Sequence, residues 1–181
     1  MRHRYRDVVK PGVRVVQATV QSFDPRTKHV VTSAGTFDAD ILVVALGADY
    51  EPDATPGLAE LGSEFYSVAG AEAARELLTG FEGGDVVIGV CGPGFKCPPA
   101  PNECALLLHD HLVARGIRDR GTIKVVVPMG VPLPPSPELS AAILRRYEER
   151  GIEYVGGHRV IALERTAGGG REAVLDDGAR L

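Results

Sequence analysis

The stretch from Asp85 to Gly116 joins an apolar strand, a loop rich in glycine and proline, and a helix, and it constrains the fold more than any other part of the chain. The run Val86–Val90 is mainly β-branched, which predicts a strand buried on both faces of a sheet. Proline is tolerated only in the first turn of a helix, so the helix is expected to begin near Pro101 or Asn102 and to end at the closing glycine. Cys97 therefore lies just ahead of a helix N-terminus.

Composition narrows the class of protein. A chain of 181 residues with 44% hydrophobic content can fill the core of one ordinary domain or of two small lobes. The formal charge of −4 argues against a nucleic-acid partner, because nucleic-acid-binding domains usually carry a basic excess. No apolar run approaches the ~20 residues that span a bilayer, and no hydrophobic signal core follows Met1, so a cytoplasmic protein is expected.

The three cysteines predict free thiols rather than a disulfide framework, because their number is odd. Cys91, Cys97 and Cys104 form no CxxC pair, so the spacing of a zinc knuckle or a thioredoxin-type site is absent. His109 and His111 are two residues apart on the expected helix and point in different directions, so they cannot share a metal ion. We therefore predict no metal site.

The order of elements predicts an α/β protein in which a small β-meander precedes βαβ units. Ile41–Leu46 is a continuous apolar run, expected to be a strand of a parallel sheet that is buried on both faces and ends at Gly47. The other expected strands are 13–20, 29–32, 123–127, 152–155, 159–163 and 172–175, and the other expected helices are 70–78 and 138–150.

Three regions follow from this order. Residues 1–50 hold the meander and the buried strand, residues 51–84 a connector and a helix, and residues 85–181 a second domain. The pattern of Val13–Gly47 begins again at His158 without its closing strand. We therefore expect the chain to be an internal fragment of a longer protein.

The glycines after the first βαβ strand resemble a dinucleotide-binding loop only in part. Gly89, Gly92 and Gly94 lie where a GxGxxG motif would lie, but their spacing differs and prolines delay the helix. The strand that ends at Val127 also lacks the acidic residue that usually binds a ribose hydroxyl. Both departures count against nicotinamide binding by this half.

Cys97 is the better candidate for chemistry. The thiolate is the reactive form of cysteine, and both Lys96 and the positive end of the helix would favour it. Neighbouring prolines argue against burial of Cys97, whereas Cys91 and Cys104 are expected to be structural. Glu103, in the first helical turn, either complements the helix dipole or accepts a proton near the thiol. Gly47, at the end of its strand, is where open α/β sheets receive cofactors.

Two motifs resemble a known family. The segment KCPPAPNECA, Lys96 to Ala105, is similar to the Cys-Pro-Pro-Gly-Pro-Tyr-Glu run of flavocytochrome c sulfide dehydrogenases and to the Cys-x-Gly-Pro-x-x-Glu of sulfide:quinone oxidoreductases. DADILVVALGA, Asp38 to Ala48, resembles the Asp-x-Leu-Val-x-Ala-Thr-Gly strand of two-domain flavoproteins. Both families belong to the FAD-dependent pyridine nucleotide-disulfide oxidoreductases, so the resemblance implies an incomplete FAD/NAD(P)-binding, Rossmann-like three-layer fold.

The resemblance also implies roles for particular residues. Cys97 would be the redox-active cysteine, working with a second cysteine from a later part of the protein, and Glu103 matches the glutamate of the motif. Val20 would contact the adenine of FAD, and Ala45, Leu46 and Gly47 would line the cofactor. In two departures from the pattern, Leu46 stands at the usual threonine and Asn102 at the usual tyrosine. The chain also lacks a third cysteine around residues 66–68, which favours the two-cysteine chemistry of flavocytochromes.

The resulting hypothesis is a fragment of an FAD-dependent enzyme that oxidises sulfide, or a related small sulfur compound, through Cys97. Electrons would pass through the flavin to a quinone or a cytochrome, and segments outside this sequence could attach the protein to a membrane surface. The isolated fragment is expected to be inactive. Two alternatives remain open, an NAD(P)H-dependent flavin reductase of the same fold and a degenerate, non-catalytic nucleotide-binding module.

Overall fold

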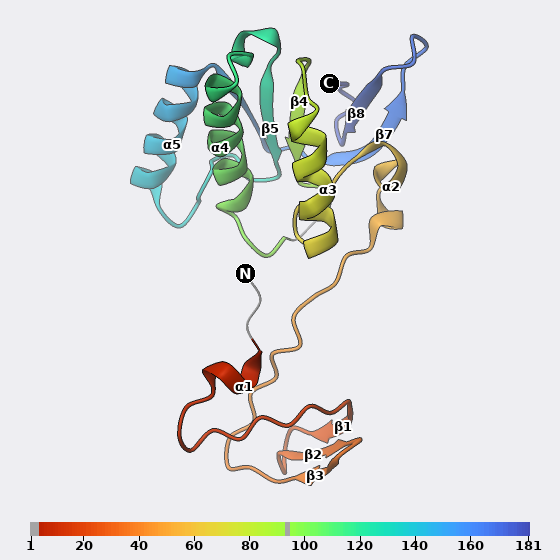
Figure 1. Ribbon diagram of the computed structural model, residues 1–181, viewed down its shortest axis with the longest axis vertical. Helices are drawn as coiled ribbons and strands as arrows, with labels where there is room; N and C mark the ends of the chain where they lie inside the picture. Colours follow the sequence, from red (N-terminus) through yellow and green to blue (C-terminus); the bar gives the residue numbers. More distant parts are fainter. Residues whose placement is uncertain (1–3, 93–94) are drawn as a thin grey trace. The chain divides into compact units, whose positions relative to one another are not determined.

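The computed structural model describes residues 4–92 and 95–181 (Figure 1). It divides the chain into two compact units, Met1–Asp49, which we call unit 1, and Tyr50–Leu181, which we call unit 2. Gly94, one of the glycines of the imperfect loop motif, lies outside the described residues. No helix in the described ranges is long and apolar enough to cross a membrane.

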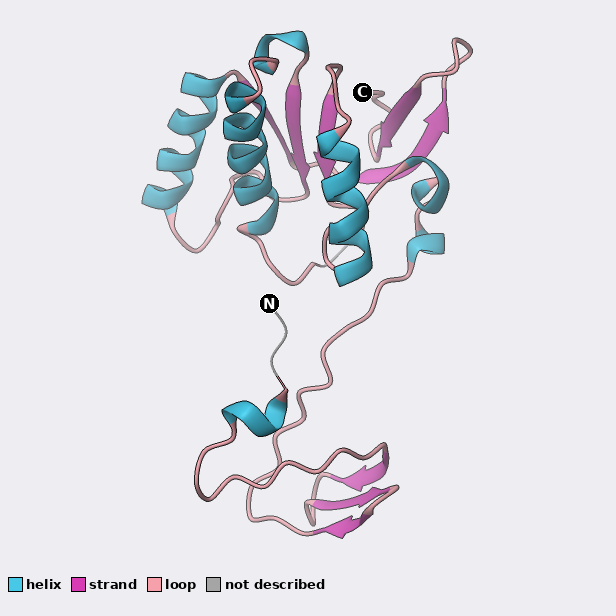
Figure 2. Ribbon diagram, in the orientation of Figure 1, coloured by secondary structure: helices cyan, strands magenta, loops and turns pink. Residues whose placement is uncertain are grey.

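Unit 1 is built around a three-stranded antiparallel sheet in the order β1-β2-β3 (Figure 2). Its elements are helix α1 (Tyr5–Val8) and strands β1 (Val20–Asp24), β2 (His29–Thr32) and β3 (Gly35–Phe37). The expected strand over residues 13–20 was wrong, since β1 begins where that strand was to end. The reason lies in the partner strand. Thr32, the last residue of β2, pairs with Val20 on one side and with Gly35 on the other, and beyond it only the turn residue Ser33 bonds to Thr19.

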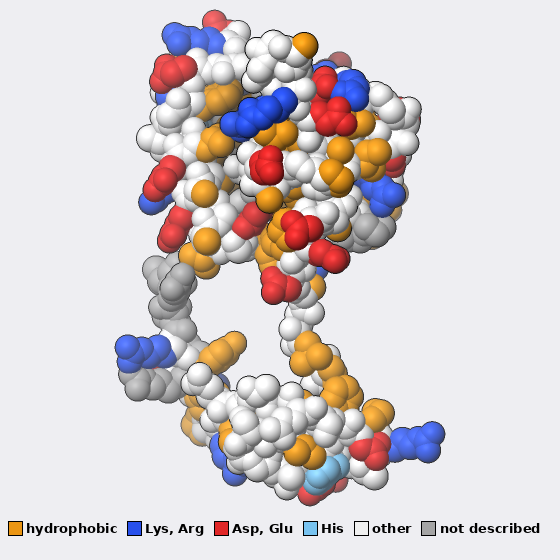
Figure 3. All heavy atoms as spheres, turned by 90° about the vertical axis from the view of Figure 1, so that its right-hand side faces the viewer, with side chains coloured by type: hydrophobic (Ala, Val, Ile, Leu, Met, Phe, Trp, Pro, Cys, Tyr) orange, Lys and Arg blue, Asp and Glu red, His pale blue; other side chains and the backbone are white. Residues whose placement is uncertain are grey.

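The prediction of a buried strand over Ile41–Leu46 was also wrong. These residues form no strand, and Ile41, Val43 and Leu46 are 81%, 79% and 79% exposed. A strand of a parallel sheet needs neighbours to accept its backbone hydrogen bonds and to cover both of its faces. No strand within the described residues pairs with this segment, so its apolar side chains stay on the surface, where hydrophobic side chains are visible in Figure 3.

Unit 2 contains the parallel sheet that its βαβ pattern predicts. Strand β4 (Val86–Gly89), helix α4 (Ala100–Ala114), strand β5 (Ile123–Val127), helix α5 (Pro137–Arg150) and strand β6 (Ile152–Gly156) follow one another, and the parallel strands lie in the order β4-β5-β6. The remaining elements are helices η1 (Pro52–Ala54), α2 (Leu58–Leu61), α3 (Val68–Thr79) and η2 (Arg118–Arg120) and the antiparallel strands β7 (Val160–Arg165) and β8 (Arg171–Leu175).

Two hydrophobic clusters make unit 2 a three-layer structure. Val125 and Val127 of β5 pack with residues of α4 and α5, and Figure 1 shows α3, α4 and α5 on that side of the sheet. Val126, between them, points to the opposite face and packs with Val160 of β7 and Leu175 of β8. All three valines of β5 are 0% exposed, and the expected three-layer α/β fold is confirmed in this unit, where the layers are the helices, the parallel sheet and the β7–β8 hairpin.

Candidate functional site

The candidate site lies in the loop that follows β4, at the carboxyl edge of the parallel sheet, where open α/β folds usually bind ligands. Gly89 ends β4, and a side chain there would meet Cγ2 of Val160 at 2.6 Å. The next residue continues toward β7, since the N–H of Val160 donates to the carbonyl of Val90 at 3.1 Å. Gly89 is therefore needed for close packing against β7.

Cys97 lies on the surface two residues before the N-cap of α4. Helix α4 begins at Ala100, with Pro99 as its N-cap and without a side-chain cap. The Ala100 N–H donates to the carbonyl of Cys97 at 2.9 Å, which closes a turn immediately ahead of the helix. The prolines thus keep Cys97 out of regular structure, as the sequence predicts.

The other two cysteines differ from Cys97 in exposure. Cys91 and Cys104 are half-buried. Burial raises the pKa of Cys91, and a hydrogen bond with Thr55 offsets part of that rise. Burial also raises the pKa of Cys104, and the negative charge of Glu103 adds to it. At neutral pH both are therefore held as thiols, which makes them poor nucleophiles.

Glu103 is exposed in the first turn of α4 and its N–H donates to the carbonyl of Pro99 at 2.9 Å. This position suits a residue that complements the positive end of the helix. The negative charge of its carboxylate acts on Cys104, whose pKa it helps to raise. Its role as a proton acceptor for Cys97 stays a prediction.

Aromatic side chains that the sequence analysis did not select lie beside this loop. The ammonium of Lys96 lies 4.1 Å from the ring centroid of Tyr66, and Tyr66 meets Tyr50 edge to face at 4.9 Å between ring centroids. Lys96 thus places its charge over an aromatic face, a favourable cation–π arrangement. Tyr50 ends the first predicted region and Tyr66 lies in the predicted connector, and no hydrophobic period marks either residue.

The residues expected to bind a cofactor all lie in unit 1. Val20, at the start of β1, is 47% exposed, and Ala45–Gly47 lie in the extended, exposed segment that follows β3. Gly47 has a φ of +73°, and a side chain there would have nothing within 4 Å. A glycine in the left-handed region with open space around it leaves its backbone accessible. Cys97 and Glu103, in contrast, both belong to unit 2.

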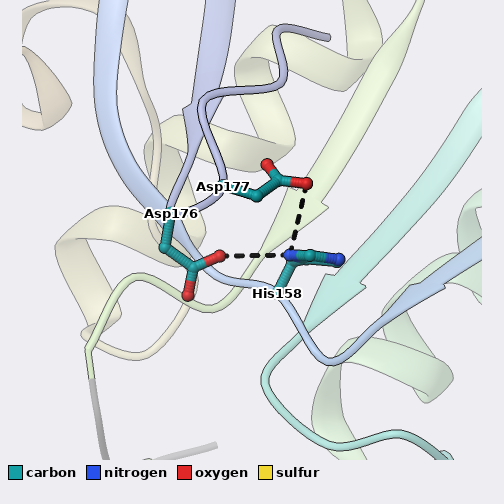
Figure 4. Close-up of side chains that lie close together, drawn as sticks. All are labelled: His158, Asp176 and Asp177. Atoms are coloured by element: carbon teal, nitrogen blue, oxygen red, sulfur yellow. Dashed lines mark hydrogen bonds and ion pairs between the residues drawn. The ribbon is translucent and has the colours of Figure 1, made fainter.

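A cluster of one histidine and two aspartates lies at the turn beyond β8 (Figure 4). Nδ1 of His158 is 3.2 Å from Oδ1 of Asp176 and 3.6 Å from Oδ2 of Asp177. Arg159 already pairs with Asp176, with its Nε 3.7 Å from Oδ2 and its N–H 3.4 Å from Oδ1. The cluster therefore joins the start of the β7–β8 hairpin to its end. His158 is 18 residues from Asp176 in the sequence, so no local pattern could reveal the cluster.

A shallow cavity of about 530 Å³ lies at the opposite, amino edge of the sheet. Arg118 lines it and uses its guanidinium to bind the carbonyls of Gly121, Arg150 and Gly151 and Nδ1 of His109. The guanidinium therefore binds backbone carbonyls at the ends of α5 and η2 instead of facing a ligand. This cavity is distant from the carboxyl edge and contributes nothing to the candidate site.

Comparison with known proteins places the fold. No protein-family model matches the chain. An NADH dehydrogenase-like protein of Mycobacterium tuberculosis, found in strains CDC 1551 / Oshkosh and H37Rv, is 35% identical over 128 residues, which cover 67% of this chain and 31% of that protein. The chain spans about a third of the length of these curated relatives.

Solved structures match over most of the chain. The sulfide:quinone oxidoreductase of Aquifex aeolicus superposes with a TM-score of 0.65 at 22% identity, over 92% of this chain and 39% of that one. A ferredoxin reductase of Rhodopseudomonas palustris gives a TM-score of 0.56 at 21% identity, over 92% and 38%. A pyridine nucleotide-disulfide family oxidoreductase of Enterococcus faecalis V583 gives 0.51 at 17% identity, over 91% and 35%. This chain has part of the FAD/NAD(P)-binding, Rossmann-like fold.

Proposed function

We propose that the chain is part of an FAD-dependent oxidoreductase that oxidises sulfide, or a related small sulfur compound, through Cys97. The observation that carries the proposal is the contrast among the three cysteines. Cys97 is exposed in a proline-rich loop at the carboxyl edge of a parallel sheet, whereas Cys91 and Cys104 are half-buried and burial raises their pKa values. A reactive thiol must be accessible and able to ionise, and Cys97 is the cysteine that meets the first condition.

The comparisons support this class of chemistry. The matched structures include a sulfide:quinone oxidoreductase, a ferredoxin reductase and a pyridine nucleotide-disulfide oxidoreductase. At 22% identity or less, these matches support the fold and not a particular substrate. The choice of a sulfur substrate rests on the Lys96–Ala105 motif together with the exposure of Cys97.

Unit 1 offers residues that fit a flavin nucleotide. Gly47 leaves its backbone open, and Val20 and Leu46 present exposed apolar side chains that could cover the rings. When bound, FAD would supply a two-electron acceptor. The chain's own part is to hold the cofactor through these residues and Ala45 and to present Cys97 to the sulfur compound. A quinone or a cytochrome would then take up the electrons, and attachment to a membrane surface remains part of the proposal.

An NAD(P)H-dependent flavin reductase is the second candidate, and the curated relatives favour it because they are named NADH dehydrogenase-like. What counts against it is the glycine loop of the sequence, whose spacing departs from GxGxxG and whose prolines delay the helix. A non-catalytic nucleotide-binding module is the third candidate, and it requires Cys97 to be dispensable.

The three candidates can be separated in one anaerobic titration. The chain is expressed within its natural flanking sequence, its flavin spectrum is recorded, and sulfide or NADH is added in separate samples. We expect sulfide to bleach the flavin absorbance in the unaltered protein and not in Cys97→Ser. Cys104→Ser is the matched control, because it removes a half-buried thiol from the neighbouring helix, and bleaching should survive there.

Each other outcome selects a different candidate. Bleaching by sulfide that survives Cys97→Ser would exclude the thiol mechanism. Rapid reduction by NADH without any response to sulfide would establish the flavin reductase. A protein that binds nucleotide and responds to neither donor would be the non-catalytic module.

A further inference from the structure

A buried polar pair joins α5 to the first turn of α4. Tyr147 is 1% exposed and Asn102 is 3% exposed, and the hydroxyl of Tyr147 donates to Oδ1 of Asn102 at 2.8 Å. Tyr147 otherwise packs in a cluster of apolar residues. Burying polar groups costs free energy unless they are hydrogen-bonded, and here the two groups bond to each other. Loss of either partner would leave the other buried and unpaired.

The pair continues into the loop that carries Cys97. Nδ2 of Asn102 donates to the carbonyl of Pro98 at 3.2 Å. Pro98 and Pro99 have no N–H, so their carbonyls are the backbone groups through which the loop can be held. A chain of hydrogen bonds therefore leads from Tyr147 through Asn102 to the residue next to Cys97.

The direction of each hydrogen bond is determined by the chemistry of the groups. A carbonyl can only accept, so the amide nitrogen of Asn102 must face Pro98 and its oxygen must face Tyr147. Burial, with a smaller contribution from Tyr154, raises the pKa of Tyr147, so its phenol stays protonated and remains a donor. The loop is thus held by neutral groups that do not titrate near neutral pH.

We infer that Asn102 and Tyr147 are positioning residues for Cys97. Tyr147 orients the amide of Asn102, and Asn102 holds Pro98, so that the Cys97 peptide stays at the N-terminus of α4. The importance of this arrangement for catalysis rests on the proposed function of Cys97. The inference is also particular to this chain, because Asn102 stands where the resembling motif has tyrosine.

The test measures the rate at which iodoacetamide alkylates each cysteine of the 181-residue chain, followed by peptide mass spectrometry. The variants are Asn102→Leu, Tyr147→Phe and the double variant. Tyr154→Phe is the matched control, because it removes the hydroxyl of another core tyrosine, one that donates to Met129 instead. We expect the rate of Cys97 alkylation to fall roughly threefold or more in the single and double variants, because a loop that has lost a hydrogen bond no longer holds Cys97 at the N-terminus of α4. The rate should stay unchanged in the control.

Two internal references separate positioning from a general loosening of the fold. Cys91 and Cys104 are half-buried, so their alkylation would accelerate if the variants opened the core. The double variant removes both partners of the buried Tyr147–Asn102 bond and leaves only the Pro98 carbonyl without its donor, so its urea midpoint should recover toward that of the unaltered chain while its Cys97 rate stays low. A Cys97 rate that returns to normal in the double variant, or a parallel change at all three cysteines, would overturn the inference.

Failure of this inference can be told apart from failure of the proposed function. If the Cys97 rate depends on Asn102 and Tyr147 but sulfide never reduces the flavin, the positioning stands and the sulfur chemistry is wrong. If sulfide oxidation requires Cys97 and the Cys97 rate ignores both residues, the chemistry stands and the positioning is wrong.

Discussion

Similar apolar segments are buried in unit 2 and exposed in unit 1. In unit 2 the valines at positions 125, 126 and 127 are 0% exposed, whereas in unit 1 Ile41 and Val43 are 81% and 79% exposed. Strand β5 lies between β4 and β6, with helices on one face and the β7–β8 hairpin on the other. The segment at 41–46 has no such neighbours among the described residues. Burial of an apolar run is therefore decided by the elements around it and not by its own composition.

The largest expected effect comes from placing a charge in each segment. Val125→Asp buries an unpaired carboxylate in the centre of unit 2 and should destabilise it by about 4 kcal/mol or more, because no partner compensates the charge. Val43→Asp should change stability by less than about 0.5 kcal/mol in this chain, since its side chain already faces water. Urea unfolding followed by circular dichroism measures both. An equal loss in the two variants would contradict the contrast between the units.

A matched pair of hydroxyls sharpens the comparison. Oγ of Ser140 accepts the N–H of Leu133 and donates to the carbonyl of the same residue, and Ser140 is 3% exposed. Oγ1 of Thr32 makes the same two kinds of bond, accepting from Ala34 and donating to Gly35, and these bonds are exposed although Thr32 itself is half-buried.

Removing each hydroxyl should therefore have unequal effects. Ser140→Ala is expected to cost about 1–2 kcal/mol, because it leaves the part-buried N–H of Leu133 without its partner, while the carbonyl of Leu133 keeps the N–H of Ser136. Thr32→Val should cost a few tenths of a kcal/mol, because water replaces the lost bonds. Thermal unfolding of the two variants against the unaltered chain gives the comparison. If Thr32→Val were the more damaging variant, the hydrogen bonds of unit 1 would be better shielded from water than those of unit 2.

The acid sensitivity of stability should change least, and one aspartate in each unit should contribute to it in the same way. The side-chain hydrogen bond from Thr122 is the main cause that lowers the pKa of Asp85, and the N–H of Arg26 is the main cause that lowers the pKa of Asp24. A carboxyl whose pKa is lower in the folded state stabilises the fold above its ordinary value, 3.8, and loses that contribution as the pH falls through the lowered value.

Asp85→Asn and Asp24→Asn should therefore each flatten the dependence of stability on pH below about pH 4 without altering it near neutrality. Chemical denaturation at a series of acidic pH values provides the measurement. An asparagine variant that is as acid-sensitive as the unaltered chain would show that its carboxylate contributes nothing to this dependence.

The parts of the fold that local signals predict are those marked by stop residues. Ser136 caps α5, Pro137 occupies its first turn, and Gly151 ends it with a φ of +60°, so its bounds agree with the sequence within one residue. Strand β5 has the bounds that its apolar run predicts. The fold class and the exposure of Cys97 could be read in the same way.

The rest depends on contacts between distant residues. No local pattern says that β2 ends before it can pair with residues ahead of Val20, or that 41–46 finds no partner strand. Asn102 and Tyr147 are 45 residues apart, and only the crossing of α4 and α5 brings them together. The candidate site could thus be located from the sequence, while the groups that hold it in place could not.

If Cys97 receives the sulfur atom, the mass of its peptide must increase by that atom. The flavin-loaded protein, expressed with its natural flanks, is mixed anaerobically with one equivalent of sulfide, quenched, and digested for mass spectrometry. Loss of two electrons from the thiol and sulfide together to the flavin would leave a persulfide, so we predict one added sulfur atom on the Cys97 peptide and none on those of Cys91 and Cys104. Flavin reduction with no sulfur added to Cys97 would contradict oxidation of sulfide through this thiol.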